Sequence, residues 1–217
     1  MSEAGTPGER LNGLLRGAGL EPLDGAAATR FDLYLSLLLR WGSRINLTAL
    51  RDEDSILARH FLESIACARA LPSGLGTLLD FGSGAGLPGI PIALCRPETL
   101  VTLAESQNKK AAFLQEAVRS LGLSAHVFAG RAETLTLQFD CVTMRAVDRM
   151  PEAVGAAVSL IRAGGSLALM TSDGELEGLK VAAGAGFSWD EPVRLPGGDR
   201  RLLAIGVKAE SGESESS

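Results

Sequence analysis

The sequence predicts an α/β fold in which a helical N-terminal extension precedes a mostly parallel sheet wound by βαβ units, and the sheet ends in an antiparallel hairpin. Three observations lead to this fold. They are apolar residues at helical spacing early in the chain, short apolar runs separated by helix-length segments in the middle, and two strand-like runs around a Pro-Gly-Gly turn near the end. We expect the extension at 1–71, the sheet domain at 72–208 and a disordered acidic tail at 209–217.

The N-terminal helices follow from two stripes of apolar residues, at Leu11–Leu15 and Phe31–Leu38. A third helix is expected from about residue 54 through Ala68, and it ends before Pro72.

The strands follow from five short apolar runs: Thr77–Phe81, Val101–Ala104, Ala125–Ala129, Cys141–Thr143 and Ser166–Met170. Their alternation with helix-length segments is typical of βαβ units. After a further helix at about 175–183, the runs Trp189–Leu195 and Arg201–Lys208 flank a short turn, which predicts an antiparallel hairpin.

The composition is that of a globular protein, with 46% hydrophobic and 22% charged residues among 217. The longest nearly apolar run, Leu33–Leu39, is shorter than the roughly 20 residues of a membrane helix, and the N-terminus lacks the pattern of a secretory signal. Cys67, Cys95 and Cys141 are far apart, which favours reduced thiols over disulfides or a zinc site. We therefore expect a cytoplasmic protein with no membrane segment and no metal.

The net charge of −5 argues mildly against a protein that coats nucleic acid. Three of the negative charges lie in the tail Glu210–Ser217, however, so a local basic patch on the folded part remains compatible with the sequence.

The most informative segment is the glycine-rich loop after the first predicted strand, with Gly82, Gly84 and Gly86 at alternate positions. Glycine allows a sharp turn and a close approach of a ligand to the backbone. A dinucleotide fingerprint would need glycine where Leu87 stands, and no Gly-Lys-Ser/Thr of a phosphate-binding P-loop follows. The spacing suits a nucleoside with an amino-acid-like tail and no pyrophosphate.

Charged residues end the next predicted strands. Glu105 could accept hydrogen bonds from both ribose hydroxyls, or it could simply cap the helix that starts near Gln107. Glu133, near an expected adenine edge, and Arg145 could instead be surface charges or an ion pair. Because carboxyl ends of parallel strands meet at one edge of a sheet, their joint occurrence favours a nucleoside site.

Four strings carry a resemblance to a known family: RWGSRINLT at 40–48, RHFLES at 59–64, DFGSGAGLPGIP at 80–91 and MRA at 144–146. Over roughly Leu11–Lys208 the chain resembles the small-subunit ribosomal RNA methyltransferase G family, also called the glucose-inhibited division protein B family. The resemblance implies that the sheet domain at 72–208 is a Rossmann-like, class I methyltransferase domain that binds S-adenosyl-L-methionine. It places cofactor contacts on Gly82, Leu87, Glu105, Ser106, Gln107, Ala132, Glu133 and Arg145, to which the loop analysis adds Gly84.

The implied substrate is N7 of one guanine in 16S ribosomal RNA, free or in a small ribosomal subunit precursor, and we expect a monomeric enzyme. N7 carries an available lone pair, so the reaction needs positioning rather than a general base, and we predict no catalytic residue. Candidate RNA contacts are Arg40, Arg44, Arg51, Arg59, Lys109 and Lys110, although each could belong to a solvated helix face.

Three other functions remain compatible with parts of the pattern. They are a methyltransferase of this fold acting on a protein or small molecule, a nucleotide-binding regulatory module, and a nicotinamide oxidoreductase. Leu87 in place of the last fingerprint glycine counts against the oxidoreductase.

Overall fold

The computed structural model describes residues 5–47, 52–198 and 200–210. The chain begins with α1 (Pro7–Gly17) and α2 (Gly25–Gly42), whose N-caps are Thr6 and Asp24. Each cap side chain accepts a hydrogen bond from a backbone N–H of the first turn, which satisfies one of the donors that a helix start leaves unpaired.

The third helical segment is continuous from residue 53 to residue 70, as predicted, but it contains a π-helical turn. It consists of α3 (Glu53–Ile56), the π turn η1 (Leu57–Phe61) and α4 (Leu62–Ala70). Such turns inside α-helices are frequent at functional sites, and this one carries Arg59 and His60.

One sheet of eight strands forms the centre of the molecule. Its strands are β1 (Thr77–Phe81), β2 (Leu100–Ala104), β3 (Ala125–Phe128), β4 (Phe139–Arg145), β5 (Ile161–Ser172), β6 (Phe187–Trp189), β7 (Val193–Arg194) and β8 (Arg201–Lys208). The order is β3-β2-β1-β4-β5-β8-β6, and β1 to β5 are parallel. The chain extends the sheet first from β1 towards β3 and then from β4 towards β5. Between β1 and β4 lies the switch point at which open α/β sheets bind ligands.

The predicted parallel strands are confirmed, and β4 and β5 extend beyond the predicted runs at both ends. The antiparallel C-terminal end is also confirmed, because β8 pairs antiparallel with β5, β6 and β7. The prediction of one strand at Trp189–Leu195 is wrong: the segment is divided into β6 and β7. Pro192 lies between them, and proline has no N–H to donate to a strand ladder.

Helices cover both faces of the sheet. They are α5 (Gly89–Cys95), α6 (Asn108–Leu121), α7 (Met150–Ala157) and α8 (Leu176–Ala183), with short 3-10 turns η2 (Ala132–Thr134) and η3 (Val158–Leu160). Successive residues of β1 alternate between two cores: Leu78 packs in the cluster with α4, α5 and α6, whereas Leu79 packs in the cluster with α7 and α8. Burial on both faces explains why the strands appear in the sequence as nearly continuous apolar runs.

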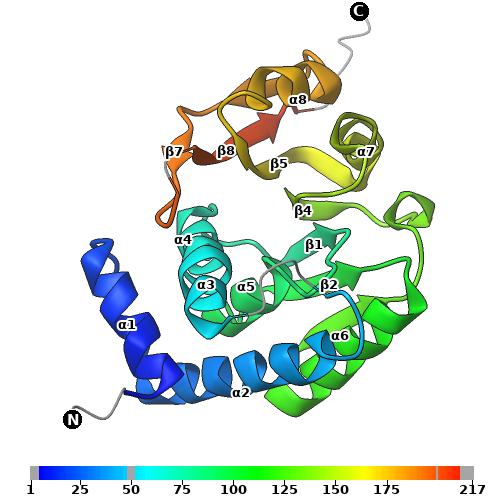
Figure 1. Ribbon diagram of the computed structural model, residues 1–217. Coiled ribbons are helices and arrows are strands. Elements are labelled where there is room, and N and C mark those ends of the chain that lie inside the picture. The colour runs from blue at the N-terminus through cyan, green and yellow to red at the C-terminus, as the bar shows by residue number, and fades with distance from the viewer. Residues whose placement is uncertain (1–4, 48–51, 199, 211–217) are drawn as a thin grey trace, which may run out of the picture.

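The N-terminal helices share a core with the sheet. Buried residues of α1, α2 and α4 belong to the same cluster as Leu78 of β1, and α2 runs alongside α6 (Figure 1). Where these two helices meet, Trp41 contacts Phe113 edge-on and donates a hydrogen bond of 3.0 Å to Glu116. The boundary between residues 71 and 72 stays a prediction.

Two remaining expectations concern membrane-spanning helices and the acidic tail. Across the three described ranges, none of the helices is both long enough and apolar enough to cross a bilayer. The predicted acidic tail lies mostly outside the described residues, which end at Glu210.

Candidate cofactor site

The glycine-rich loop leaves the carboxyl end of β1 in a conformation that explains its composition. Gly82, Gly84 and Gly86 have φ values of +72°, +57° and +84°, in the left-handed region that residues with a Cβ rarely adopt. A Cβ on Gly86 would lie 2.5 Å from the side chain of Ile90, whereas at Gly84 the nearest atom is 3.9 Å away. Gly84 therefore faces open space at the sheet edge.

The loop is held from both the sheet and the N-terminal extension. The buried carboxylate of Asp80 accepts hydrogen bonds from the Gly89 N–H (3.1 Å) and the Thr143 hydroxyl (3.2 Å). Burial raises the pKa of Asp80 to about 6. From α2, the buried Tyr34 hydroxyl donates a hydrogen bond of 2.6 Å to the Ala85 carbonyl. Both contacts fix the loop over the switch point.

Glu105, at the end of β2, bridges the glycine loop and the start of α6. One carboxylate oxygen accepts from the Gly84 N–H at 2.9 Å, and the other accepts from the Gln107 N–H at 2.7 Å. The predicted capping alternative is not confirmed: Gln107 is itself the N-cap residue, and no side chain caps the first turn of α6. Each carboxylate oxygen has a second lone pair, so the group can still accept from ribose hydroxyls.

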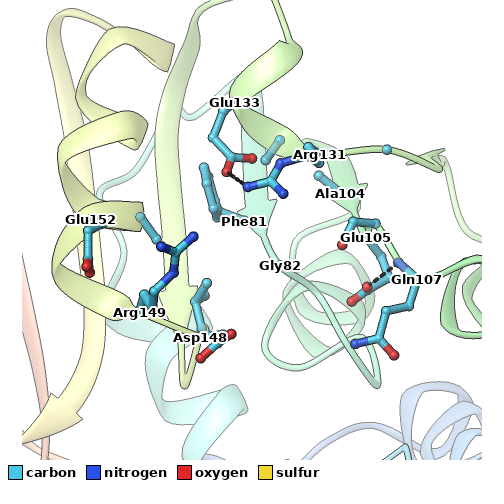
Figure 2. A pocket seen from close by; sticks show the side chains of 15 residues that line it. Phe81, Gly82, Ala104, Glu105, Gln107, Arg131, Glu133, Asp148, Arg149 and Glu152 are labelled. Atoms are coloured by element: carbon cyan, nitrogen blue, oxygen red, sulfur yellow. Dashed lines mark hydrogen bonds and ion pairs between the residues drawn. The ribbon is translucent and has the colours of Figure 1, made fainter.

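A first hollow of about 290 Å³ opens between the ends of β2 and β4. In Figure 2, Glu105 and Gln107 lie on one side, Asp148, Arg149 and Glu152 on the other, and an ion pair between Arg131 and Glu133 above. Gly82, Ser106 and Ala132 complete the predicted residues that line it. A hydrogen bond from the backbone N–H of Glu133 and the charged side chain of Arg131 both lower the pKa of the Glu133 carboxyl, which favours its ionised form.

A second hollow of about 480 Å³ adjoins the first. It is lined by Gly84, Leu87 and Arg145, and it shares Glu105 and Gln107, among others, with the first hollow. The structure therefore brings all predicted site residues to one edge of the sheet, distributed over two connected hollows.

Arg145 occupies a buried position in which its guanidinium binds the RHFLES segment. It forms an ion pair of 2.9 Å with the buried Glu63, donates to the Arg59 carbonyl at 2.8 Å, and contacts His60 at 3.0 Å and Ser64 at 3.3 Å. Burial raises the pKa of Glu63, and burial together with the charge of Arg145 lowers that of His60 to about 4. Two of the strings noted in the sequence thus meet at one contact.

Sequence reasoning missed lining residues on the π turn η1 and on the loop and helix that follow β4. Arg149 and Glu152 line the first hollow, and His60 lines the second, yet none was predicted as a site residue. Ala146 and Arg149 have positive φ values of +49° and +48°, which is unusual for residues other than glycine and recurs at functional sites. Nothing in their residue types signals this conformation; only the position of the loop at the switch point could have suggested it.

The candidate RNA contacts lie in different environments. Arg40 is ion-paired with Glu116, and Arg59 is exposed on the π turn. Arg44, Lys109 and Lys110 line a hollow of their own next to the second one. Arg51 lies outside the described residues.

Comparison with known proteins gives relatives over nearly the whole chain. Residues 27–186 match the family model described as rRNA small subunit methyltransferase G. The Ribosomal RNA small subunit methyltransferase G of Xanthomonas euvesicatoria is 40% identical over 94% of this chain and 99% of its own length. The protein of that name from Stenotrophomonas maltophilia is 39% identical, with the same coverage.

Solved structures of low sequence identity share the fold. A predicted O-methyltransferase from Agrobacterium tumefaciens has a TM-score of 0.56 at 20% identity, covering 67% of this chain and 80% of its own. A ribosomal protein L11 methylase from Lactobacillus delbrueckii has a TM-score of 0.56 at 17% identity, covering 72% and 80%. The family model covers residues 27–186, and the relatives match along 94% of the chain, including the glycine loop and the acidic end of β2. The chain therefore belongs to the rRNA small subunit methyltransferase G family.

Proposed function

We propose that this protein transfers a methyl group from S-adenosyl-L-methionine to N7 of a guanine in 16S ribosomal RNA. The observation that carries the proposal is the convergence of Gly84, Glu105, Glu133 and Arg145, far apart in sequence, on two connected hollows at the switch point of the sheet. Membership of the family supports the choice of an RNA substrate.

The residues present fit the cofactor. A Cβ on Gly84 would project into the open space beside the loop, and Glu105 retains acceptor capacity at the end of β2. We assign the ribose hydroxyls to Glu105, the adenine to the Ala132–Glu133 side of the first hollow with Ser106 and Gln107 beside it, and the amino-acid tail to Gly82, Gly84 and Leu87.

Arg145 has a different place in this assignment. Its guanidinium is engaged by the RHFLES segment, so the residue lines the second hollow while it holds η1 and α4 against the end of β4. We therefore propose that Arg145 contributes to the cofactor site chiefly by shaping the wall next to the amino-acid tail.

The part of the second hollow that the amino-acid tail leaves open is then the place for the target base. When bound, the cofactor supplies an electrophilic methyl group, and the neutral guanine offers its N7 lone pair without losing a proton. The protein has to align the two atoms at about 3–3.5 Å, and it needs no general base. The walls formed by the glycine loop and by residues 145–148 provide this alignment.

The finer points of the proposal concern the form of the substrate. We propose that the enzyme acts as a monomer in the cytoplasm on 16S ribosomal RNA, either free or in a precursor of the small ribosomal subunit. The scarcity of aromatic residues, 5% of the chain, supports recognition of a folded or assembled RNA rather than of a single strand by base stacking.

The experiment combines binding with product analysis. Calorimetry should show binding of S-adenosyl-homocysteine and none of NAD. Incubation with labelled S-adenosyl-L-methionine and small subunits or free 16S RNA should then place the label in 7-methylguanosine, identified by mass analysis of nucleosides. Binding of NAD alone would favour an oxidoreductase, and label in a ribosomal protein would favour a protein methyltransferase.

A further inference from the structure

A third hollow, of about 420 Å³, lies between the C-terminal end of α2 and the start of α6. Ser43, Arg44 and Asn46 line it from the segment that follows α2, and Gln107, Lys109 and Lys110 line it from the other side. Its function is not accounted for by cofactor binding, since Arg44 and Lys109 line neither the first nor the second hollow.

The charge of the third hollow is positive. Arg44 and Lys109 are exposed and Lys110 is half-buried, and no carboxylate lines the hollow within the described part of the chain. None of the three cations forms an ion pair with another described residue. Arg40 differs: it lies in the last turn of α2 and is ion-paired with Glu116 of α6. Cations that converge on one hollow without a counter-charge repel one another, and a bound anion removes that repulsion.

The third hollow is next to the place proposed for the target base. Gln107 and Lys110 line both the second and the third hollow. In an RNA strand every base is joined through its ribose to a phosphodiester group. A base held in the second hollow therefore has a phosphate of its own or of the neighbouring nucleotide close by, and Lys110 is a cation on the wall that the two hollows share.

We propose that the third hollow binds a phosphodiester group of the RNA strand beside the target guanine. This inference rests on the proposed function and adds the surface along which the strand runs. Arginine and lysine are the side chains that bind phosphate in nucleic acids, and Ser43 and Asn46 add polar groups on the same wall. The contact fixes the register of the strand without reading its sequence.

The test uses the double variant Arg44→Ala/Lys109→Ala, because these residues lie on opposite walls of the third hollow and line neither the first nor the second hollow. The affinity for a 16S RNA fragment is measured at several salt concentrations. Loss of one phosphate contact should reduce the slope of log affinity against log salt by about one unit. The affinity for S-adenosyl-homocysteine and the melting temperature should be unchanged.

The matched control is Arg30→Ala/Arg119→Ala, which removes the same charge from two exposed arginines that line none of the three hollows. It should keep the wild-type slope. The charge-conserving pair Arg44→Lys/Lys109→Arg should also retain RNA affinity, which a role of these side chains in local packing does not predict.

Two results would overturn the proposal. One is a slope for Arg44→Ala/Lys109→Ala equal to that of the wild type or reduced no more than in the control. The other is saturable binding of inorganic phosphate by the wild type that the double variant loses while its RNA affinity stays unchanged, which would assign the hollow to a free anion. Failure of the proposed function is distinguishable, because wild-type protein would then form no 7-methylguanosine in any RNA.

Discussion

At the scale of single residues, Glu105 connects the elements that make up the site. Its two oxygens accept from Gly84 and Gln107, which belong to the loop after β1 and to the start of α6. The same carboxylate is assigned to the ribose hydroxyls, so it fixes the two walls relative to the ligand that they hold.

Glu105→Gln tests this assignment. The amide keeps one acceptor oxygen, but its NH₂ group faces a backbone donor, so affinity for S-adenosyl-homocysteine should fall by about 1–3 kcal/mol, the usual worth of a hydrogen bond to a charged group. Titration calorimetry measures this loss, and Glu105→Asp should restore part of it because the carboxylate is retained. A lower melting temperature with unchanged affinity in the glutamine variant would leave Glu105 with a purely structural role, as the bridge between the glycine loop and Gln107.

Gly84→Asn tests whether the space at the loop belongs to the ligand. Asparagine tolerates the left-handed region better than most residues, so the fold should survive, while the new side chain occupies the second hollow. Affinity for S-adenosyl-homocysteine should fall at least about tenfold, or about 1.4 kcal/mol.

Gly122→Asn is the matched control for Gly84→Asn. Gly122 has a φ of +61°, close to the +57° of Gly84, and also has open space around a Cβ, but it caps the C-terminal end of α6 away from the hollows. Equal affinities in the two variants would show that the loop does not contact the cofactor.

The pKa of Asp80 predicts a pH dependence of stability. Its value of about 6 lies above the usual 3.8, so between these values the folded protein binds more protons than the unfolded chain. The contribution of Asp80 is therefore fully present below pH 4 and is lost as pH rises through 6. Relative to Asp80→Asn, the wild type should lose about 2–3 kcal/mol of unfolding free energy between pH 4 and 7.

Denaturant titrations of both proteins across this range measure the difference directly. The wild type must be compared with Asp80→Asn at each pH because His60 titrates in the same range. The pKa of His60 is lowered to about 4, so His60 acts in the opposite direction and destabilises the fold as pH falls below 6.5. Parallel stability curves for the wild type and Asp80→Asn would contradict the raised pKa of Asp80.

At the scale of elements, helix α2 supports the cofactor loop directly. Tyr34 stacks on Phe61 at 5.0 Å between ring centroids and donates its hydroxyl to the Ala85 carbonyl. The extension is thus part of the site, although the family resemblance alone places the cofactor contacts in the sheet domain.

Tyr34→Phe should reveal this support. The ring still packs, but the buried Ala85 carbonyl loses its donor, which costs about 1–3 kcal/mol of unfolding free energy. Because the loop is less restrained, cofactor affinity should fall as well. Ser36→Ala on the same helix removes an exposed bond to the Asp32 carbonyl and is the control. A variant less stable but equal in affinity would give Tyr34 a purely structural role.

The elements differ in how far local sequence predicts them. The run Thr77–Phe81 matches β1 because a strand buried on both faces is largely apolar, with Asp80 as the buried charged exception. The predicted strand at Trp189–Leu195 is interrupted by Pro192. The proline is visible in the sequence, but the prediction gave more weight to the apolar residues around it. The π turn of η1 has no such signal, because its geometry is associated with contacts that Arg59, Glu63 and Arg145 make across the fold.

The candidate site shows the same limit. Gly82, Gly84 and Glu105 were predictable, since glycine spacing and a strand-end carboxylate are local patterns. The engagement of Arg145 by Glu63 and the bridging contacts of Glu105 were not, because they depend on how distant segments meet.

At the scale of the whole molecule, three hollows follow one another. The first lies beside Glu133, the second beside Gly84 and Arg145, and the third between the end of α2 and the start of α6. Shared lining residues connect each hollow to the next, Gln107 being common to all three. This arrangement provides one surface on which a cofactor, a base and a strand phosphate fit side by side.

The measurement that tests the account most directly is the methyl content of 16S RNA after incubation with labelled S-adenosyl-L-methionine and the wild type, Gly84→Asn or Gly122→Asn. We predict 7-methylguanosine, up to one per RNA molecule, with the wild type and Gly122→Asn, and a strongly reduced rate with Gly84→Asn. Absence of 7-methylguanosine with wild-type protein that binds S-adenosyl-homocysteine, or equal rates for the wild type and Gly84→Asn, would contradict the account.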